Sequence, residues 1–170
     1  LVAHDFATMS NLPAGAATLA GGAYAVAYTT KSDLPFDIGD ITLRIIAANG
    51  TVGPEIAVNT TTNGRQLDAR VATNGQNLFV SWWYEATQDV RGQILSLAGP
   101  KIGAEFLVPS TTVGDAGRPQ IEALPNGNYI VVWEAIDADG ADASSGSAGG
   151  RLFNSTGAAI GNEFVLNQNT

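Results

Sequence analysis

One phrase occurs three times along the chain, and this repetition limits the possible folds more than any other feature. In each copy a short apolar strand ends on a large aromatic residue, so the copies align Tyr28, Trp82 and Trp133 at equivalent positions. The three copies read GAYAVAYTT (22–30), QNLFVSWWYE (76–85) and GNYIVVWEA (127–135). A recurrence at roughly 50 residues indicates a tandem repeat of one small structural unit.

A second phrase follows each copy of the first in the same order. It contains a hydrophobic pair, a glycine turn, a Gly-x-Glu group and an apolar strand, and it places Glu55, Glu105 and Glu163 at one position per unit. The copies are LRIIAANGTVGPEIAVNTT (43–61), GQILSLAGPKIGAEFLVPST (92–111) and GRLFNSTGAAIGNEFVLNQN (150–169). Two independent phrases in a constant order make the repeat a strong prediction.

Each unit is expected to hold four short antiparallel strands, because each phrase reads as two strands around a turn. The pairs Asn74-Gly75 and Asn126-Gly127 predict type I′ hairpin turns, in which both central residues have positive φ. No long stretch free of Gly and Pro shows a helical apolar period. The sequence therefore predicts an all-β fold of three tandem four-stranded antiparallel units.

The predicted units span approximately 12–61, 62–111 and 112–170 within a single all-β domain, and residues 1–11 resemble the last strand of a preceding unit. Four strands every 50 residues is typical of a β-propeller blade, although a propeller closes with about four to eight blades. Three units could be completed by association of chains or by a longer protein, or they could form a β-sandwich instead. Exposed sheet edges favour association, so other protein chains, including further copies of this one, are the predicted partners.

The last unit, RPQIEALPNGNYIVVWEA followed by GRLFNSTGAAIGNEFVLNQNT, resembles a tandem Trp-containing β repeat of large bacterial secreted and surface proteins. The resemblance weakens toward the N-terminus, where Tyr28 replaces the Trp. It implies an extracellular or cell-surface location, a propeller-blade-like architecture, and proximity to calcium-binding segments of the repeats-in-toxin type. It implies no catalytic residue.

Charge excludes one class of partner. The chain has 16 acidic and 8 basic residues and a net charge of −8, and no cluster of Lys and Arg offsets it, so nucleic acid is not an expected partner. No apolar run is long enough to span a membrane, and membrane insertion is not expected. There is no cysteine, which excludes disulfides and thiolate metal sites.

The acidic loop after the third aromatic strand carries the predicted metal site. Asp137, Asp139 and Asp142 surround Gly140, and closely spaced carboxylates on a loop suit calcium, which takes six to eight oxygen ligands. The competing interpretation is a solvated acidic loop in which Asp and Gly form turns.

Two aromatic residues next to Trp82 are the predicted ligand contacts. Alternation along the strand places Trp82 and Trp83 on opposite faces, and Trp82 recurs in the other units, which favours a core position. Trp83 has Glu134 as its counterpart, so Trp83, with Tyr84, is the candidate platform for a stacked sugar or aromatic ligand. Packing of Trp83 against a neighbouring sheet is the alternative.

Catalytic patterns are weak. His4 is the single histidine, and an isolated histidine does not make a nucleophile–base pair. The three repeated glutamates are expected to bind backbone donors or an arginine such as Arg44 or Arg151 rather than to converge as a catalytic pair. We therefore expect a non-enzymatic extracellular structural or adhesive module that makes protein–protein contacts, with calcium as the candidate ion that would stiffen it. The alternatives are a carbohydrate-binding propeller lectin and a glycoside hydrolase-like scaffold.

Overall fold

The computed structural model describes residues 14–30, 39–110, 115–136 and 147–166, and these residues form three antiparallel sheets of four strands each. Sheet 1 contains β1 (Gly15–Thr18), β2 (Tyr24–Thr29), β3 (Ile41–Ile46) and β4 (Ile56–Ala57). Sheet 2 contains β5 (Gln66–Thr73), β6 (Asn77–Tyr84), β7 (Asp89–Ser96) and β8 (Lys101–Leu107). Sheet 3 contains β9 (Asp115–Ala123), β10 (Tyr129–Ile136), β11 (Ser147–Phe153) and β12 (Ala159–Val165).

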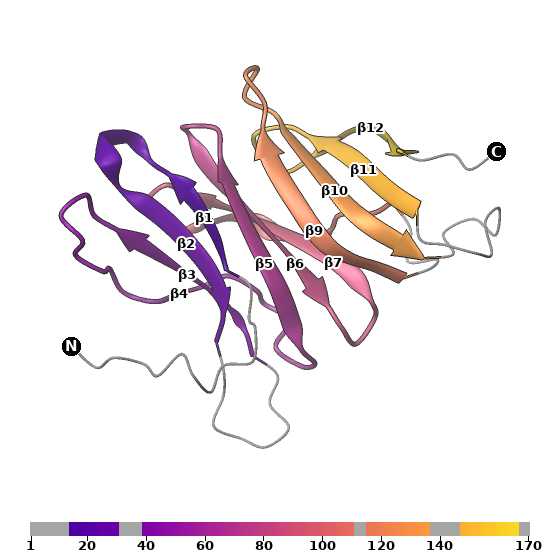
Figure 1. Ribbon diagram of the computed structural model, residues 1–170, viewed down its shortest axis with the longest axis horizontal. Coiled ribbons are helices and arrows are strands. Elements are labelled where there is room, and N and C mark those ends of the chain that lie inside the picture. Colours follow the sequence, from indigo (N-terminus) through magenta and orange to yellow (C-terminus); the bar gives the residue numbers. More distant parts are fainter. Residues whose placement is uncertain (1–13, 31–38, 111–114, 137–146, 167–170) are drawn as a thin grey trace.

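Each sheet is a meander in which every strand pairs with the next one along the chain. The first strands of the three sheets, β1, β5 and β9, lie next to one another, and the later strands spread outward from them (Figure 1). The predicted all-β fold of three tandem four-stranded antiparallel units is confirmed. The sheets are arranged side by side around their first strands, which is not a β-sandwich.

The loop after the first strand differs from the predicted type I′ turn. Gly75 and Gly127 have positive φ, 84° and 83°, but Asn74 and Asn126 do not. Each Asn side chain instead accepts hydrogen bonds from the loop backbone: Oδ1 of Asn74 accepts from the N–H of Gln76 at 3.0 Å. The type I′ prediction is wrong because these loops are longer than two residues, so one glycine with positive φ and an Asx turn reverse the chain.

The second hairpin of every sheet uses one loop geometry. In sheet 3 the N–H of Gly157 donates to the carbonyl of Asn154 at 3.0 Å, and the N–H of Asn154 donates to the carbonyl of Ala158 at 2.9 Å. The glycine, with φ of 85°, occupies the left-handed position of a three-residue hairpin loop, where a Cβ would be strained. Sheets 1 and 2 repeat these two hydrogen bonds around Gly50 and Gly99.

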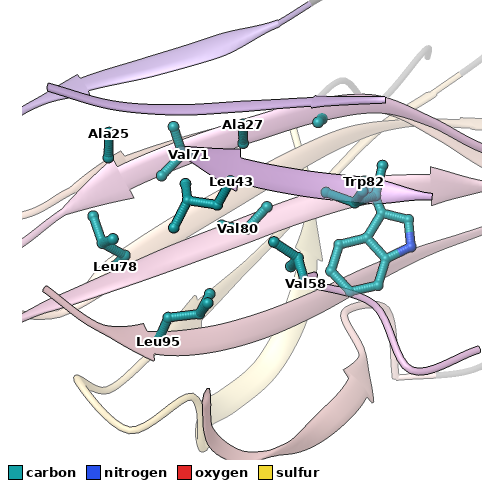
Figure 2. Close-up of a cluster of buried hydrophobic side chains, with 11 residues drawn as sticks. Ala25, Ala27, Leu43, Val58, Val71, Leu78, Val80, Trp82 and Leu95 are labelled. Carbon is teal, nitrogen blue, oxygen red and sulfur yellow. The ribbon is translucent and has the colours of Figure 1, made fainter. Parts of the chain in front are cut away.

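The first hydrophobic core lies between sheets 1 and 2. Trp82 is fully buried, beside Val58 of sheet 1 (Figure 2), and its Nε1 donates to Oε1 of Gln66 at 2.7 Å. This bond satisfies the indole N–H, which would otherwise be costly to bury. The remaining buried members of this cluster are Ala25, Ala27, Ile41, Leu43, Ala69, Val71, Leu78, Val80 and Leu95.

The second core lies between sheets 2 and 3 and is rich in aromatic rings. Phe79 meets Tyr129 and Phe153 edge-on, with ring centroids 5.4 Å and 5.5 Å apart, and such edge contacts add to the stabilisation from area burial. Phe106 lies 5.5 Å from Phe79. Trp133 belongs to the same cluster and is 5% exposed. Trp82 and Trp133 are thus core residues between sheets.

The helical content of the described residues is one 3-10 turn, Ala20–Gly22. It is far too short to cross a bilayer, and the described part of the chain contains no helix that could do so.

Candidate functional site

The candidate site is an open cavity of about 410 Å³ where the first strands of the three sheets meet. It is lined by residues 15–18 of β1, 70–73 of β5 and 120–123 of β9. Several of these residues carry polar side chains that are exposed or half-buried: Thr18, Arg70, Thr73, Gln120 and Glu122. The topology therefore places one cation, one carboxylate and several neutral hydrogen-bonding groups around a single opening.

Close approach of two strands forms one wall of this cavity. A Cβ on Gly15 would lie 2.7 Å from Cα of Arg70 and 2.8 Å from N of Val71. Only glycine allows β1 to approach the β5 backbone this closely. The residue at position 15 therefore sets the distance between the first two strands that line the opening.

Bulges at equivalent positions alter the direction of β5 and β9 near the cavity. The pairing of β5 with β6 shifts between Leu67 and Arg70, and Asp68 within the shift has a φ of 55°. In β9, Arg118 has a φ of 49° beside the corresponding shift. Positive φ is strained for residues with a Cβ, and bulges redirect side chains near binding sites. Two charged residues are held in this conformation at the same place in two sheets.

Trp83 lies at the boundary between sheets 2 and 3. It pairs with Leu67 and Val90 on its two neighbouring strands, and its ring lies 3.7 Å from the Cβ position of Gly117 in sheet 3. The side chain is half-buried, so part of the indole remains accessible to a ligand while part packs on β9. Ligand binding at Trp83 stays a prediction.

Tyr84, the second predicted ligand contact, is 4% exposed. The guanidinium of Arg91 lies 4.5 Å from the centroid of the Tyr84 ring, a cation–π contact. The Tyr84 hydroxyl lies 3.4 Å from Oδ1 of Asn63. A ligand would have to displace Arg91 to stack on this ring. The structure therefore brings Trp83, but not Tyr84, to the surface.

The repeated glutamates make separate contacts, and two of them, Glu105 and Glu163, accept backbone hydrogen bonds from the preceding sheet. Oε1 of Glu55 forms an ion pair with Arg44 at 2.6 Å, which confirms the expected partner. Oε1 of Glu105 pairs with Arg91 at 2.8 Å, and Oε2 of Glu163 accepts the backbone N–H of Ser110 in the preceding sheet at 2.6 Å. Arg151, the other predicted partner, donates to the carbonyl of Val108 at 3.3 Å.

Glu105 has the most enclosed of these carboxylates, with a side chain 4% exposed. Its Oε2 accepts hydrogen bonds from Thr60 N at 2.7 Å, Thr60 Oγ1 at 3.0 Å and Thr61 N at 3.1 Å. Burial alone would raise the pKa of Glu105, but the hydrogen bonds from Thr60, Arg91 and Thr61 outweigh it, and the pKa lies below its ordinary value. This carboxylate remains ionised and acts as a structural anion.

The predicted calcium ligands, Asp137, Asp139 and Asp142, and the single histidine, His4, lie outside the described residues. Among the residues that are described, no group of three or more His, Asp or Glu side chains is close enough to hold a metal ion. Calcium binding by the acidic loop stays a prediction.

The local sequence does not distinguish the polar residues of the cavity from other polar strand residues. Arg70 and Gln120 occupy equivalent positions, because each lies two residues beyond the strained residue of its bulge. The arrangement of the repeats could have located them, because in a propeller the first strand of each unit lies next to the central channel. Polar residues at alternate positions of those strands therefore mark the axis.

Comparison with solved structures establishes the fold. Residues covering 97% of the chain superpose on 65% of an endo-arabinase from Bacteroides thetaiotaomicron VPI-5482, with a TM-score of 0.56 and 18% identity. The chain has the fold of part of a β-propeller. No family model matches the sequence, and no curated protein matches it.

Two further propeller structures give the same result. A protein described as Bacteroides ovatus Xyloglucan PUL GH43B matches with a TM-score of 0.54 and 11% identity, over 88% of this chain and 27% of that one. A structure from the GH130 family of mannoside phosphorylases, which contains glycoside hydrolases that target β-1,2-mannosidic linkages in Candida mannan, matches with a TM-score of 0.51 and 13% identity, over 86% of this chain and 49% of that one. The chain thus spans between about a quarter and two thirds of the length of these proteins. The β-propeller fold is shared with glycoside hydrolases at low identity.

Proposed function

We propose that this chain is a carbohydrate-binding part of a β-propeller and that the sugar binds in the cavity at the first strands. The observation that carries the proposal is that Arg70, Gln120 and Glu122 all line one opening at the propeller axis. Sugars present many hydroxyl groups, and a site with a cation, a carboxylate and an amide offers both donors and acceptors for them. The fold supports the proposal because the similar solved structures include an endo-arabinase and a structure from a family whose glycoside hydrolases target β-1,2-mannosidic linkages.

The proposed activity is binding without hydrolysis. Glycoside hydrolysis ordinarily needs two carboxyl groups, roughly 5 to 10 Å apart, that flank the scissile bond. Among the described residues that line the cavity, Glu122 supplies the single carboxylate, and Glu55, Glu105 and Glu163 hold other contacts. A non-enzymatic role therefore remains part of the proposal, as does an extracellular or cell-surface location.

Calorimetric titration with oligosaccharides tests this function. The panel is arabino-oligosaccharides, xyloglucan oligosaccharides and β-1,2-mannobiose, and we expect binding heat with at least one of them. Replacing Arg70 and Glu122 together by alanine should weaken that binding about tenfold or more, because two hydrogen bonds at about 1 kcal/mol each are lost. Absence of heat with every sugar would contradict the proposal.

Two single variants locate the site. Glu85→Gln is the matched control, because Glu85 pairs with Arg65 at 2.9 Å on an exposed turn and does not line the cavity; its affinity should be unchanged. Trp83→Ala tests the platform predicted from the sequence. If Trp83→Ala abolishes binding while the Arg70 and Glu122 double variant binds normally, the sugar binds between sheets 2 and 3 and the axial site is wrong.

A structural or adhesive role is the second candidate. The observation that favours it is the presence of large exposed apolar side chains, namely Tyr24, Val52, Ile160, Val165 and Leu166, in the first and last sheets.

A further inference from the structure

The contact between neighbouring sheets is built in the same way twice, and each time an aromatic residue of the later sheet is buried with an apolar pair of the earlier one. Trp82 of sheet 2 shares the first core with Ile41 and Val58 of sheet 1. Trp133 of sheet 3 shares the second core with Val90 and Val108 of sheet 2. Each interface thus joins an aromatic residue, on the face that a sheet turns to the preceding sheet, to an apolar pair, on the face that a sheet turns to the following one.

The apolar pair is held by one backbone hydrogen bond that all three sheets contain. Val58 N donates to Ile41 O at 2.8 Å, and Val108 N donates to Val90 O at 2.9 Å. In sheet 3 the corresponding bond joins Leu166 N to Ala148 O at 2.7 Å. Ala148 and Leu166 are therefore the third copy of the pair on which the aromatic residue is seated.

On sheet 3 this pair lines a hollow. The outer face of sheet 3, meaning the face that points away from sheet 2, has a hollow of about 320 Å³, lined by Arg118, Val132, Trp133, Glu134, Ser147, Ala148 and Leu166. Leu166 is 57% exposed, whereas its equivalents Val58 and Val108 are fully buried. The hollow occupies the position at which an aromatic residue of a following sheet would be buried.

Sheet 1 presents the complementary surface. Ala25 and Ala27 of β2 face sheet 2 in the first core, so the alternate residues Tyr24, Val26 and Tyr28 lie on the opposite, outer face. The equivalents of these three residues in sheet 3, by strand pairing, are Tyr129, Val131 and Trp133, all of which are buried against sheet 2. Tyr24 is 47% exposed.

We infer that the outer face of sheet 3 binds the outer face of sheet 1 of a second copy of this chain, with Tyr28 of that copy above the Leu166 hollow. The contact is head-to-tail and would repeat the two sheet–sheet interfaces within the chain. Head-to-tail contacts form rings where the rotation closes. Two copies would supply six sheets, which lies within the range of about four to eight blades found in closed propellers. The partner is thus argued from continuity with the existing interfaces, and it does not depend on sugar binding.

Mass in solution is the first measurement. The 170-residue chain has a mass of 17.5 kDa, and light scattering or sedimentation should show a concentration-dependent species of twice that mass. A monomer at every concentration up to that of a crystallisation stock would overturn the inference. A mass that grows without limit on concentration would show open fibres and overturn the closed pair.

Leu166→Arg should convert the dimer to a monomer, because it places a charge in the hollow. Leu166 is exposed, so the midpoint of thermal unfolding measured at a concentration where the wild-type chain is monomeric should change little. Val165→Arg is the matched control. Val165 is 46% exposed. It pairs with Gly149, which also pairs with Trp133, so Val165 lies on the same face as Trp133 and not on the outer face. The Val165→Arg variant should therefore still dimerise. Equal loss of the dimer in both variants would contradict the assigned face.

Mixing two variants tests the head-to-tail arrangement. Tyr28→Ala damages the outer face of sheet 1 and should also give a monomer alone. An equimolar mixture of Leu166→Arg and Tyr28→Ala should regain a dimer, because one undamaged sheet 3 face meets one undamaged sheet 1 face. A symmetric dimer through sheet 3 alone would be unaffected by Tyr28→Ala, and that result would overturn the head-to-tail contact.

Discussion

Oε2 of Glu105 in sheet 2 lies 2.7 Å from the backbone nitrogen of Thr60, at the end of sheet 1. The same relationship joins Glu163 of sheet 3 to the backbone nitrogen of Ser110, at the end of sheet 2. Each glutamate thus connects its sheet to the preceding one through a charge-assisted hydrogen bond, which is roughly twice as strong as a neutral one. In the second and third units the glutamate of the repeated Gly-x-Glu group is thus a connection between sheets.

Replacing Glu105 by glutamine should lower the free energy of unfolding by about 2 to 4 kcal/mol, because the half-buried Arg91 loses its anion and the N–H groups of Thr60 and Thr61 lose a charged acceptor. Urea unfolding monitored by tryptophan fluorescence measures the loss. The matched control is Glu55→Gln, since the Glu55 side chain is 56% exposed and exposed ion pairs contribute little to stability; its loss should be clearly smaller. Equal losses in the two variants would contradict the role of burial.

The same carboxylate predicts a dependence on acid pH. The pKa of Glu105 is lowered in the folded chain, so its contribution to stability is fully present above the ordinary glutamate pKa and is lost as the pH falls through the folded pKa. The difference in unfolding midpoint between the wild-type chain and Glu105→Gln should be constant near neutral pH and should shrink below about pH 4. A difference that is independent of pH would show that the ionised form has no special role.

Tyr129 predicts a dependence on alkaline pH. Its hydroxyl donates to the carbonyl of Asn77 at 2.8 Å across the interface between sheets 2 and 3, and burial raises its pKa to about 12. Because the folded pKa lies above the unfolded one, the stabilisation is present below about pH 10 and is lost as the pH rises toward 12. Absorbance at a phenolate wavelength should show one tyrosine titrating late, and Tyr129→Phe should remove that component.

A fourth stability prediction concerns Gly92, where β7 crosses the aromatic core. A Cβ at this position would lie 2.5 Å from Cε2 of Phe79 and 3.1 Å from Cζ of Phe106. Gly92→Ala should therefore destabilise the chain by about 1 to 3 kcal/mol through overpacking. The control is Gly117→Ala, whose Cβ would lie 3.7 Å from the ring of Trp83, an ordinary contact. Thermal unfolding of the two variants should differ clearly, and an unchanged Gly92→Ala midpoint would mean that the rings move aside.

Calcium binding by Asp137, Asp139 and Asp142 is tested by thermal unfolding with calcium and with a chelator. A bound ion stabilises the state that binds it, by about 2.7 kcal/mol at one hundred times its dissociation constant, so the midpoint should fall on chelation. Asp139→Asn should abolish this shift. If the chelator leaves the wild-type midpoint unchanged, the loop does not hold calcium in a way that stabilises the fold.

The repeats determined most of what could be predicted. The repeats predict a core position for Trp82 and Trp133, because an aromatic residue recurs there in every unit. They predict arginine or backbone partners for the three glutamates for the same reason. The predicted turn type at Asn74 and Asn126 is wrong, since an Asn-Gly pair indicates a turn but does not specify the number of loop residues. The side chains of Asn74 and Asn126 accept hydrogen bonds within these longer loops. The length of each loop is set by how its two flanking strands pair, which the Asn-Gly pair alone does not reveal.

The cavity cannot be predicted from local sequence, because Arg70 and Glu122 belong to different sheets and line one opening only through the arrangement around the axis. Tyr84 illustrates the opposite limit. Its exposure depends on Arg91, which lies on the next strand, and alternation along a single strand does not reveal such a cover. Contacts between sheets require knowledge of how neighbouring units are turned relative to one another.

The connection made by each glutamate has a consequence for how such a chain can vary. Glu105 and Glu163 both contact main-chain N–H groups of the preceding sheet, and every residue except proline offers such a group. The main-chain part of the contact therefore does not depend on side-chain identity, and it is kept although the ends of the two sheets differ in sequence, Asn59-Thr60-Thr61 against Pro109-Ser110. At this contact, therefore, one unit can follow another whatever side chains end the earlier unit, provided that the bonded residue is not proline.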